Sequence, residues 1–221
     1  MNMKRFFAPL LASVLILTAC NMETVFKYTN MVEFVTVSGN TLINDVGTIY
    51  TVTADETDHG WQVEGSRQYM LFDIEDRYLD VTVKKYIRAN ISEPVEYAEV
   101  TDPVDPVELF AGSFSGGYLN LELRYTRQRG SNSAHSIQMM YKEDAGGVQL
   151  FLVHRGNHEN SLYVDEEMLI TESAVYCFPV SMLPGGVATT YSVTYDVLSK
   201  NQEGQPAMVS VTENLYRPYG N

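Results

Sequence analysis

The sequence is poor in positive charge. Its 221 residues include 15 lysines and arginines against 28 aspartates and glutamates, which gives a formal net charge of −13. A chain this acidic is repelled by the phosphate backbone that dominates the affinity of most nucleic-acid-binding proteins. It also gains nothing from anionic lipid surfaces. The one dense cationic cluster, Lys84, Lys85 and Arg88, closely follows several acidic residues. We therefore expect no nucleic-acid partner.

The sequence also lacks the short motifs that mark common catalytic sites. It has no Gly-x-Ser-x-Gly elbow, no phosphate-binding glycine loop and no His-Glu-x-x-His pair. The acidic run at residues 165–167 could supply paired carboxylates for glycoside cleavage. Consecutive acids are usually a solvated surface, however, and an acid with a raised pKa needs burial that this run does not suggest. We expect no enzyme activity and no cofactor.

Histidine is scarce, with four residues in the chain, and two of them lie close together. His154 and His158, with Glu159, could form a metal site because imidazoles and carboxylates bind zinc. A spacing of four residues places two histidines on one face only in a helix, and the intervening Gly156 and Asn157 indicate a turn. We favour a turn whose polar groups satisfy its own backbone, and no metal site. His59, which lies between Asp58 and Gly60, is interpreted as a turn residue in the same way.

The two cysteines have different contexts. Cys20 follows two cations at positions 4 and 5, an apolar run over residues 6–17, and the tripeptide Leu-Thr-Ala. That is the pattern of a signal peptide, and the apolar run is shorter than the roughly 20 residues needed to cross a bilayer. Residues 17–20 resemble a bacterial lipobox, which implies removal of residues 1–19 and acylation of Cys20. Removing 19 of the 221 residues leaves 202, and the loss of two cations changes the net charge from −13 to −15. Several acyl chains together give a stable anchor.

Cys177 is then alone and cannot form an internal disulfide. It lies between apolar residues, which favours a buried strand in which free cysteine behaves as a small hydrophobe. A reactive thiol would need an electropositive, partly open surrounding, which the neighbouring sequence does not offer. We therefore expect Cys177 in the core.

Long helical periods are also missing, and apolar residues instead alternate with polar ones. Such alternation is typical of strands with one solvated face. It predicts strands over residues 119–125, 137–141 and 191–197, and residues 148–153, apolar on both faces, predict a central strand. In the front half, short segments rich in β-branched and aromatic residues predict strands at 31–37, 48–53, 68–74, 80–87 and 95–100. The fold class is all-β.

One segment suggests a domain boundary. Residues 101–106 contain Pro103 and Pro106, each lacking the N–H that a strand ladder needs. We expect a five-stranded barrel in residues 20–100, a linker at 101–106 and a β-sandwich in residues 107–221. The alternative is one larger sandwich in which both prolines lie in a long loop.

Four short motifs carry a family resemblance. The sequence Gly116-Gly117-Tyr118-Leu119-Asn120 resembles the Gly-Gly-Tyr-Leu-Asn element of the NigD-like lipoproteins of Bacteroidota. The segments at 135–137 and 152–160, and Gly65-Ser66-Arg67, are similar to other elements of that family, although the order of residues 154–157 departs from its pattern. The resemblance implies a lipid-anchored protein with an OB-like N-terminal barrel and a C-terminal β-sandwich. It also implies a connection with bacteriocin immunity.

Aromatic side chains give the one indication of binding. The chain has 15 tyrosines and one tryptophan, and such rings on a surface stack on sugars or form protein contacts. Trp61, Tyr216 and Tyr219 are the candidate binding residues, although tyrosines also fill β-protein cores as a matter of course. We expect a lipid-anchored binding module of the bacterial envelope, in the outer membrane, with a protein or carbohydrate partner. The alternatives are a bacteriocin-immunity accessory and a carbohydrate-active enzyme with an unrecognised site.

Overall fold

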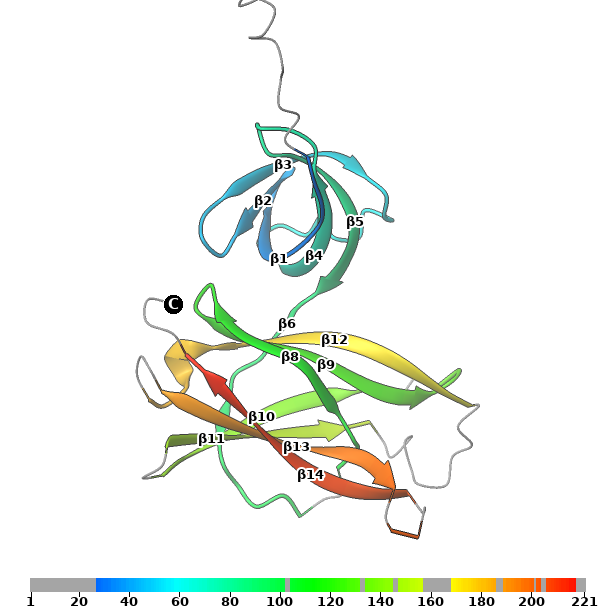
Figure 1. The fold of residues 1–221 in the computed structure, drawn as a ribbon, viewed down its shortest axis with the longest axis vertical. Coiled ribbons are helices and arrows are strands. Elements are labelled where there is room, and N and C mark those ends of the chain that lie inside the picture. Colours follow the sequence, from blue (N-terminus) through cyan, green and yellow to red (C-terminus); the bar gives the residue numbers. More distant parts are fainter. Residues whose placement is uncertain are drawn as a thin grey trace, which may run out of the picture.

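The computed structural model describes residues 27–101, 104–131, 134–144, 147–156, 168–185, 189–200, 202–203 and 206–217. The described chain is built of strands, with one short 3-10 helix, η3 (Val180–Met182). The strands form a small closed barrel standing above two packed sheets (Figure 1). The all-β prediction of a barrel and a sandwich is confirmed. No helix in the described ranges is long and apolar enough to cross a membrane. The predicted signal peptide and Cys20 lie outside the described residues.

Five strands close the barrel in the order β1-β2-β3-β5-β4. They are β1 (Tyr28–Ser38), β2 (Thr41–Asn44), β3 (Ile49–Asp55), β4 (Arg67–Ile74) and β5 (Asp80–Arg88). Four of them are predicted from the sequence. The short β2, which has only four residues, replaces residues 95–100 as the fifth strand. Closure leaves no free edge because β4 pairs with both β1 and β5.

The barrel has its own hydrophobic core. Alternate residues of each strand point inward, and on β4 these are Met70 and Phe72, both completely buried. Trp61, from the loop between β3 and β4, fills the same core. Its indole N–H donates a hydrogen bond to Asp55 at 2.6 Å, which satisfies the one polar atom of the ring.

The sandwich consists of two sheets. One has the order β14-β13-β11-β10-β7 and the other the order β6-β12-β9-β8. Their strands are β6 (Asn90–Ile91), β7 (Val95–Glu96), β8 (Glu108–Ser115), β9 (Tyr118–Gln128), β10 (Ser136–Asp144), β11 (Gly147–Arg155), β12 (Leu169–Pro179), β13 (Thr190–Lys200) and β14 (Pro206–Tyr216). A second core lies between the sheets and includes Leu121, Leu150 and Phe178. β11 is an interior strand between β10 and β13, as its apolar sequence predicts.

The path from barrel to sandwich differs from the expected one. β6 pairs with β12 and β7 pairs with β10, so residues 90–96 belong to the sandwich sheets and not to the barrel. The end of the expected linker is also part of the sandwich, because Asp105 is buried and forms a β-bridge with His154. The two residues of β6 are too few to give an alternating pattern, and β7 is only the beginning of the strand predicted at 95–100 as part of the barrel. Independent folding of the two parts stays a prediction.

Candidate functional site: the groove between barrel and sandwich

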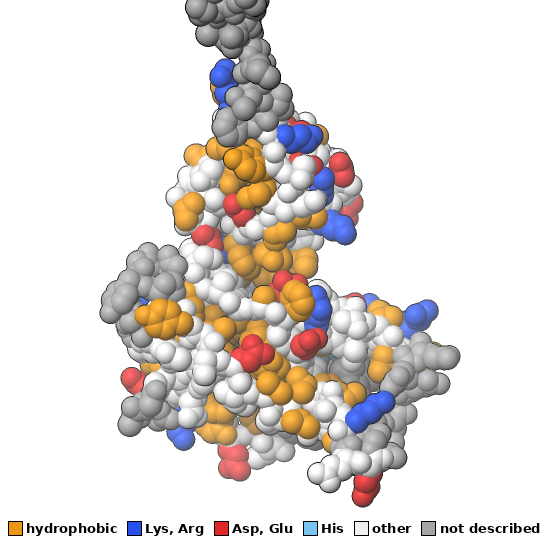
Figure 2. All heavy atoms as spheres, in the orientation of Figure 1, with side chains coloured by type: hydrophobic (Ala, Val, Ile, Leu, Met, Phe, Trp, Pro, Cys, Tyr) orange, Lys and Arg blue, Asp and Glu red, His pale blue; other side chains and the backbone are white. Residues whose placement is uncertain are grey.

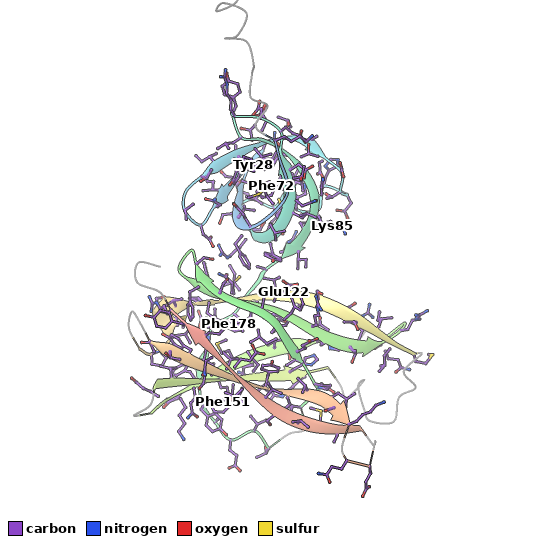
Figure 3. All side chains as sticks on the ribbon, viewed as in Figure 1. Tyr28, Phe72, Lys85, Glu122, Phe151 and Phe178 are labelled. Carbon is purple, nitrogen blue, oxygen red and sulfur yellow. The ribbon has the colours of Figure 1, made fainter. Side chains whose placement is uncertain are left out.

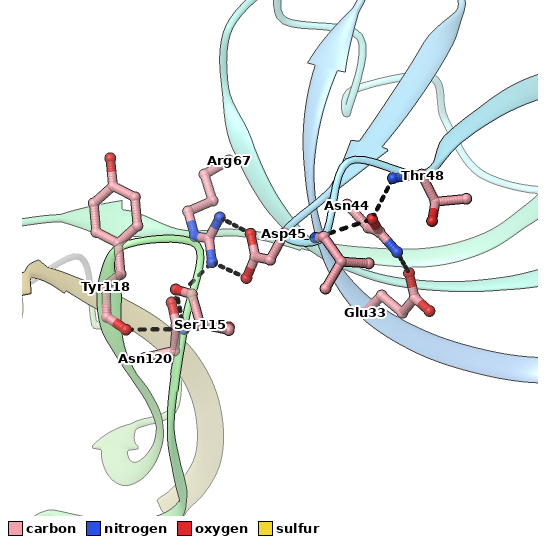
Figure 4. Close-up of polar contacts among 9 residues, drawn as sticks. Glu33, Asn44, Asp45, Thr48, Arg67, Ser115, Tyr118 and Asn120 are labelled. Atoms are coloured by element: carbon pink, nitrogen blue, oxygen red, sulfur yellow. Dashed lines mark hydrogen bonds and ion pairs between the residues drawn. The ribbon is translucent and has the colours of Figure 1, made fainter. Parts of the chain in front are cut away.

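Two of the sequence motifs meet at the junction of barrel and sandwich. Arg67, from the Gly65-Ser66-Arg67 motif, begins β4 at the end of the barrel. Its guanidinium donates two hydrogen bonds to the carboxylate of Asp45, at 2.6 and 2.7 Å, and a third to the side-chain oxygen of Asn120 in the sandwich, at 3.1 Å (Figure 4). Asn120 is the last residue of the Gly-Gly-Tyr-Leu-Asn motif and donates in turn to Ser115. The two motifs therefore form one polar network across the junction.

This network is buried. Arg67 is 5% exposed and the side chain of Asp45 is 14% exposed. Burial alone would lower the pKa of Arg67, but the hydrogen bonds and charge of Asp45 outweigh it and hold the pKa above its usual value. The planar fork of arginine matches a carboxylate in two places, which fixes orientation as well as charge. Both residues of this ion pair belong to the barrel, and the guanidinium that it orients is connected to the sandwich by the hydrogen bond to Asn120.

Aromatic rings extend the junction on both sides of Arg67. The guanidinium carbon lies 4.8 Å from the ring centre of Tyr118, in the sandwich, and 4.9 Å from that of Phe34, in the barrel. Phe34 contacts Tyr69 with ring centres 4.8 Å apart. The hydroxyl of Tyr69 donates to Glu122 on β9, and burial together with this carboxylate raises the pKa of Tyr69. Tyr69 and Glu122, at the end of this row of contacts, also line the groove described below.

Gly116 allows the sandwich to approach the ion pair. It has φ +58°, a backbone conformation that favours glycine, and a Cβ at this position would overlap the carboxylate of Asp45. Gly117 also has a positive φ, of +79°, but a Cβ there would meet nothing. The first glycine of the motif is therefore required by the junction itself, and the second only by the turn.

An open groove of about 630 Å³ lies beside the junction. Figure 2 shows hydrophobic side chains gathered where barrel and sandwich meet. The outer faces of β1, β4 and β5 supply most of the lining, and Phe110 of β8 and Glu122 of β9 supply the sandwich wall. The lining residues are Val32, Thr57, Asp58, Tyr69, Met70, Leu71, Lys84, Lys85, Tyr86, Ile87, Phe110 and Glu122. A volume of this size is within the range of small-molecule sites.

The apolar floor follows from the sequence of β4. Residues 69–72 read Tyr-Met-Leu-Phe, so the strand is apolar on both faces. Met70 and Phe72 are buried in the barrel, whereas Tyr69 and Leu71 point outward and remain half-buried beside the sandwich. A strand that is apolar on both faces of a small barrel indicates an outer surface that something else covers or binds.

Most of the charged side chains in the groove already have a hydrogen-bond or ion-pair partner within the protein. Asp58 accepts a hydrogen bond from the hydroxyl of Tyr86 at 2.9 Å, and the backbone N–H of Gly60 together with this hydroxyl lowers the pKa of Asp58. Lys84 pairs with Asp73 at 2.6 Å. Glu122 accepts from Tyr69.

Two further cavities lie in the sandwich. One, of about 510 Å³, lies between the sheets and is lined by Tyr125, Leu169 and Leu198 among others. The other, of about 380 Å³, is lined by Tyr97, Phe151 and Tyr195 among others. The groove at the junction is larger than either, and it alone of these three combines residues of both parts of the fold.

The two candidate binding rings that the structure describes, Trp61 and Tyr216, do not line this groove. Trp61 is completely buried in the barrel core, so the expectation of an accessible ring at this position is wrong. A loop position suggested exposure, but the core of a small barrel needs a large side chain to fill it. Tyr216 is 56% exposed at the end of β14 and does not line the groove. Tyr219 lies outside the described residues.

The groove residues were missed for a physical reason. Tyr69 and Lys85 come from the paired barrel strands β4 and β5, and the packing of barrel on sandwich adds Glu122 of β9. Figure 3 labels Lys85 on the barrel and Glu122 on the sandwich. The doubly apolar sequence of residues 69–72 was the one available signal.

His154 has a structural role that its sequence context did not indicate. It lies on β11, buried, and not in a turn. Its Nδ1–H donates to the carbonyl of Pro106 at 2.9 Å, so its neutral Nε2 accepts from Nδ1 of His135 at 3.0 Å. Burial lowers the pKa of His154. No group of three or more metal-ligating side chains occurs in the described part of the chain. His158, Glu159 and the acidic run at 165–167 fall outside it.

The structure also describes His59 and Cys177, the two remaining residues with a predicted role. His59 lies in a turn, as predicted, with φ +62° and a 2.6 Å contact between its Nδ1 and Asp55. Cys177 is completely buried on β12, as predicted, and burial raises the pKa of its thiol despite the nearby Arg67. Both residues therefore contribute to structure.

Comparison with known proteins identifies similar solved structures. No family model and no curated protein matches the sequence. A NigD-like immunity protein from Bacteroides caccae superposes with a TM-score of 0.54 at 18% identity, covering 82% of this chain and 93% of that one. A protein from Bacteroides fragilis that is provisionally named a lipoprotein superposes with a TM-score of 0.55 at 9% identity, covering 88% of this chain and 100% of that one. A protein of unknown function from Bacteroides vulgatus gives 0.53 at 13% identity, covering 85% and 92%. The chain thus has the fold of a NigD-like immunity protein, which is the fold that its sequence motifs imply.

Proposed function

We propose that this chain is a lipid-anchored, non-catalytic binding module of the bacterial envelope, and that its ligand binds in the groove between barrel and sandwich. The observation that carries the proposal is the groove itself, an open apolar surface of about 630 Å³ beside the hydrogen bond that connects Arg67 of the barrel to Asn120 of the sandwich. Exposed apolar surface that a protein fixes in position is typical of a binding site.

The polar groups of the groove suit binding better than proton transfer. A general acid needs a carboxyl pKa raised towards neutrality, whereas the pKa of Asp58 is lowered. Burial together with Glu122 raises the pKa of Tyr69, and the hydrogen bond to Asp58 raises that of Tyr86, so both hydroxyls stay protonated near neutral pH. None of the similar structures named above is named as an enzyme.

The proposed anchor is the acyl group on Cys20, and we place the protein in the outer membrane. The lipobox-like residues 17–20 support the acyl anchor. The similar structure from B. fragilis, which is provisionally named a lipoprotein, is in keeping with such an anchor. β1 begins at Tyr28, only eight residues after Cys20, so the barrel would lie close to the membrane. Fractionation of cells expressing Cys20→Ala tests this proposal. Unchanged membrane retention would contradict it.

A bacteriocin-immunity role is the second candidate, because the B. caccae protein of this fold is named a NigD-like immunity protein. Deletion of the gene should then sensitise the cell to a toxin made by its own strain. Full resistance of the deletion strain to every such toxin would exclude the role.

The groove proposal is tested by titrating the neutral dye N-phenyl-1-naphthylamine, whose fluorescence rises in apolar surroundings. We expect binding by the unaltered chain and weaker binding by Leu71→Gln, which places an amide on the groove floor. The matched control is Ile49→Gln, because Ile49 is an exposed apolar residue of a barrel strand outside the groove lining. Equal binding by all three proteins would refute the groove as the site.

A further inference from the structure

The groove is lined by two carboxylates and two ammonium groups, which differ in the partners that they have within the protein. Its two carboxylates, on Asp58 and Glu122, each accept a hydrogen bond from a tyrosine hydroxyl. Of its two ammonium groups, that of Lys84 is engaged by Asp73. The Lys85 ammonium forms no ion pair with any residue that the structure describes.

Lys85 is placed where a ligand could use its charge. It is exposed on β5, directly opposite Leu71 in the barrel ladder, and the apolar floor of the groove lies beside it. Figure 3 places Lys85 on the barrel and Glu122 on the sandwich strand below it. A lysine has an apolar stem and a charged tip, so it can cover an apolar ligand and still pair with an anion at its end.

The size of the groove favours a small molecule over a protein surface. Twelve described residues line it, whereas a standard protein interface uses about 20–30 residues on each side. The lining is also poorly suited to a sugar, because a sugar needs several hydrogen-bonding groups. In this groove both carboxylates and Lys84 are already hydrogen-bonded within the protein.

We propose that the groove binds a small amphipathic anion, with its apolar body on the floor formed by Tyr69, Leu71 and Ile87 and its anionic group at Lys85. This rests on the proposed function and specifies the ligand class of the same site. The site would discriminate by charge at one end and by apolar surface along the rest. A neutral molecule with the same apolar body would bind less tightly, and a cationic one least.

Competition against N-phenyl-1-naphthylamine tests the charge preference directly. The competitors are decanoate, decanol and decylamine, each below its micelle concentration, so that the three share one alkyl chain and differ in the head group. On the unaltered chain we expect decanoate to displace the dye at the lowest concentration. Lys85→Gln should weaken decanoate about three- to five-fold, the effect of losing one partly exposed ion pair, and leave decanol unchanged. Lys85→Glu should reverse the order of decanoate and decylamine.

Lys142→Gln is the matched control, because Lys142 is an exposed strand lysine of the sandwich outside the groove lining. It should bind all three competitors like the unaltered chain. Equal displacement by the three competitors, or a decanoate affinity that Lys85→Gln leaves unchanged, would overturn the inference while leaving the groove proposal intact. The groove proposal itself would fail if the dye did not bind, or bound independently of Leu71.

Discussion

Replacing Asp45 with alanine should destabilise the protein strongly, because it leaves the Arg67 guanidinium buried without its counter-ion. Arg67 is 5% exposed, and two of its three hydrogen bonds to side-chain oxygens go to Asp45. Removing one partner of a buried ion pair costs about 3–5 kcal/mol. Domains of this size are stable by only about 5–15 kcal/mol in total. The expected loss is therefore a large part of the total free energy of unfolding.

Urea unfolding measures this loss, and the chain provides its own probe. Trp61 is the single tryptophan and lies in the barrel core, so its fluorescence reports on barrel unfolding. Lys27→Ala is the control, since it removes the exposed partner of the Lys27–Glu75 pair and should leave the midpoint almost unchanged. The double variant Asp45→Ala, Arg67→Met should recover part of the loss, because no buried charge remains. A loss below about 1 kcal/mol in Asp45→Ala would show that the pair is effectively solvated and refute the reasoning.

Three other outcomes follow from the junction and the sandwich. Gly116→Ala should destabilise more than Gly117→Ala in urea unfolding, because both strain a positive φ but only the first overlaps Asp45; equal losses would contradict this. A fragment of residues 89–221 should melt cooperatively and at a higher temperature than residues 107–221, because the shorter one lacks β6, β7 and Asp105; the reverse order would argue against these pairings. Burial lowers the pKa of His154 below its usual 6.5, so the unfolded chain binds a proton first as the pH falls through 6.5. Stability is therefore complete above that pH and decreases below it, and the drop in urea midpoint between pH 7.5 and 5.5 should be smaller in His154→Gln; an equal drop would contradict the assignment.

The sequence was most informative where alternation was long. It predicted β4 and β5 almost to the residue, and the interior position of β11 follows from a segment that is apolar on both faces. It missed β6 and placed β7 within a longer strand of the barrel, because each has only two residues and is formed by pairing with a sandwich strand. Period-two patterns need several residues to be recognised, so such strands are set by tertiary contacts.

The candidate site was less predictable than the fold for the same reason. Arg67 and Asn120 stand within motifs that the sequence marked, but nothing in a linear pattern shows that the two side chains meet. Trp61 was misplaced because a loop position near glycine suggested exposure, whereas the barrel core needed its volume. The groove forms where the barrel packs on the sandwich, so no single segment of the sequence predicts it.

A crystal structure of the mature chain soaked with decanoate would test the central claim most directly. The account predicts density for the alkyl chain between β4 and the sandwich wall at Phe110, with the carboxylate within ion-pair distance of the Lys85 ammonium. Density in the cavity between the sandwich sheets, beside Leu169 and Leu198, with the groove at the junction empty, would contradict it.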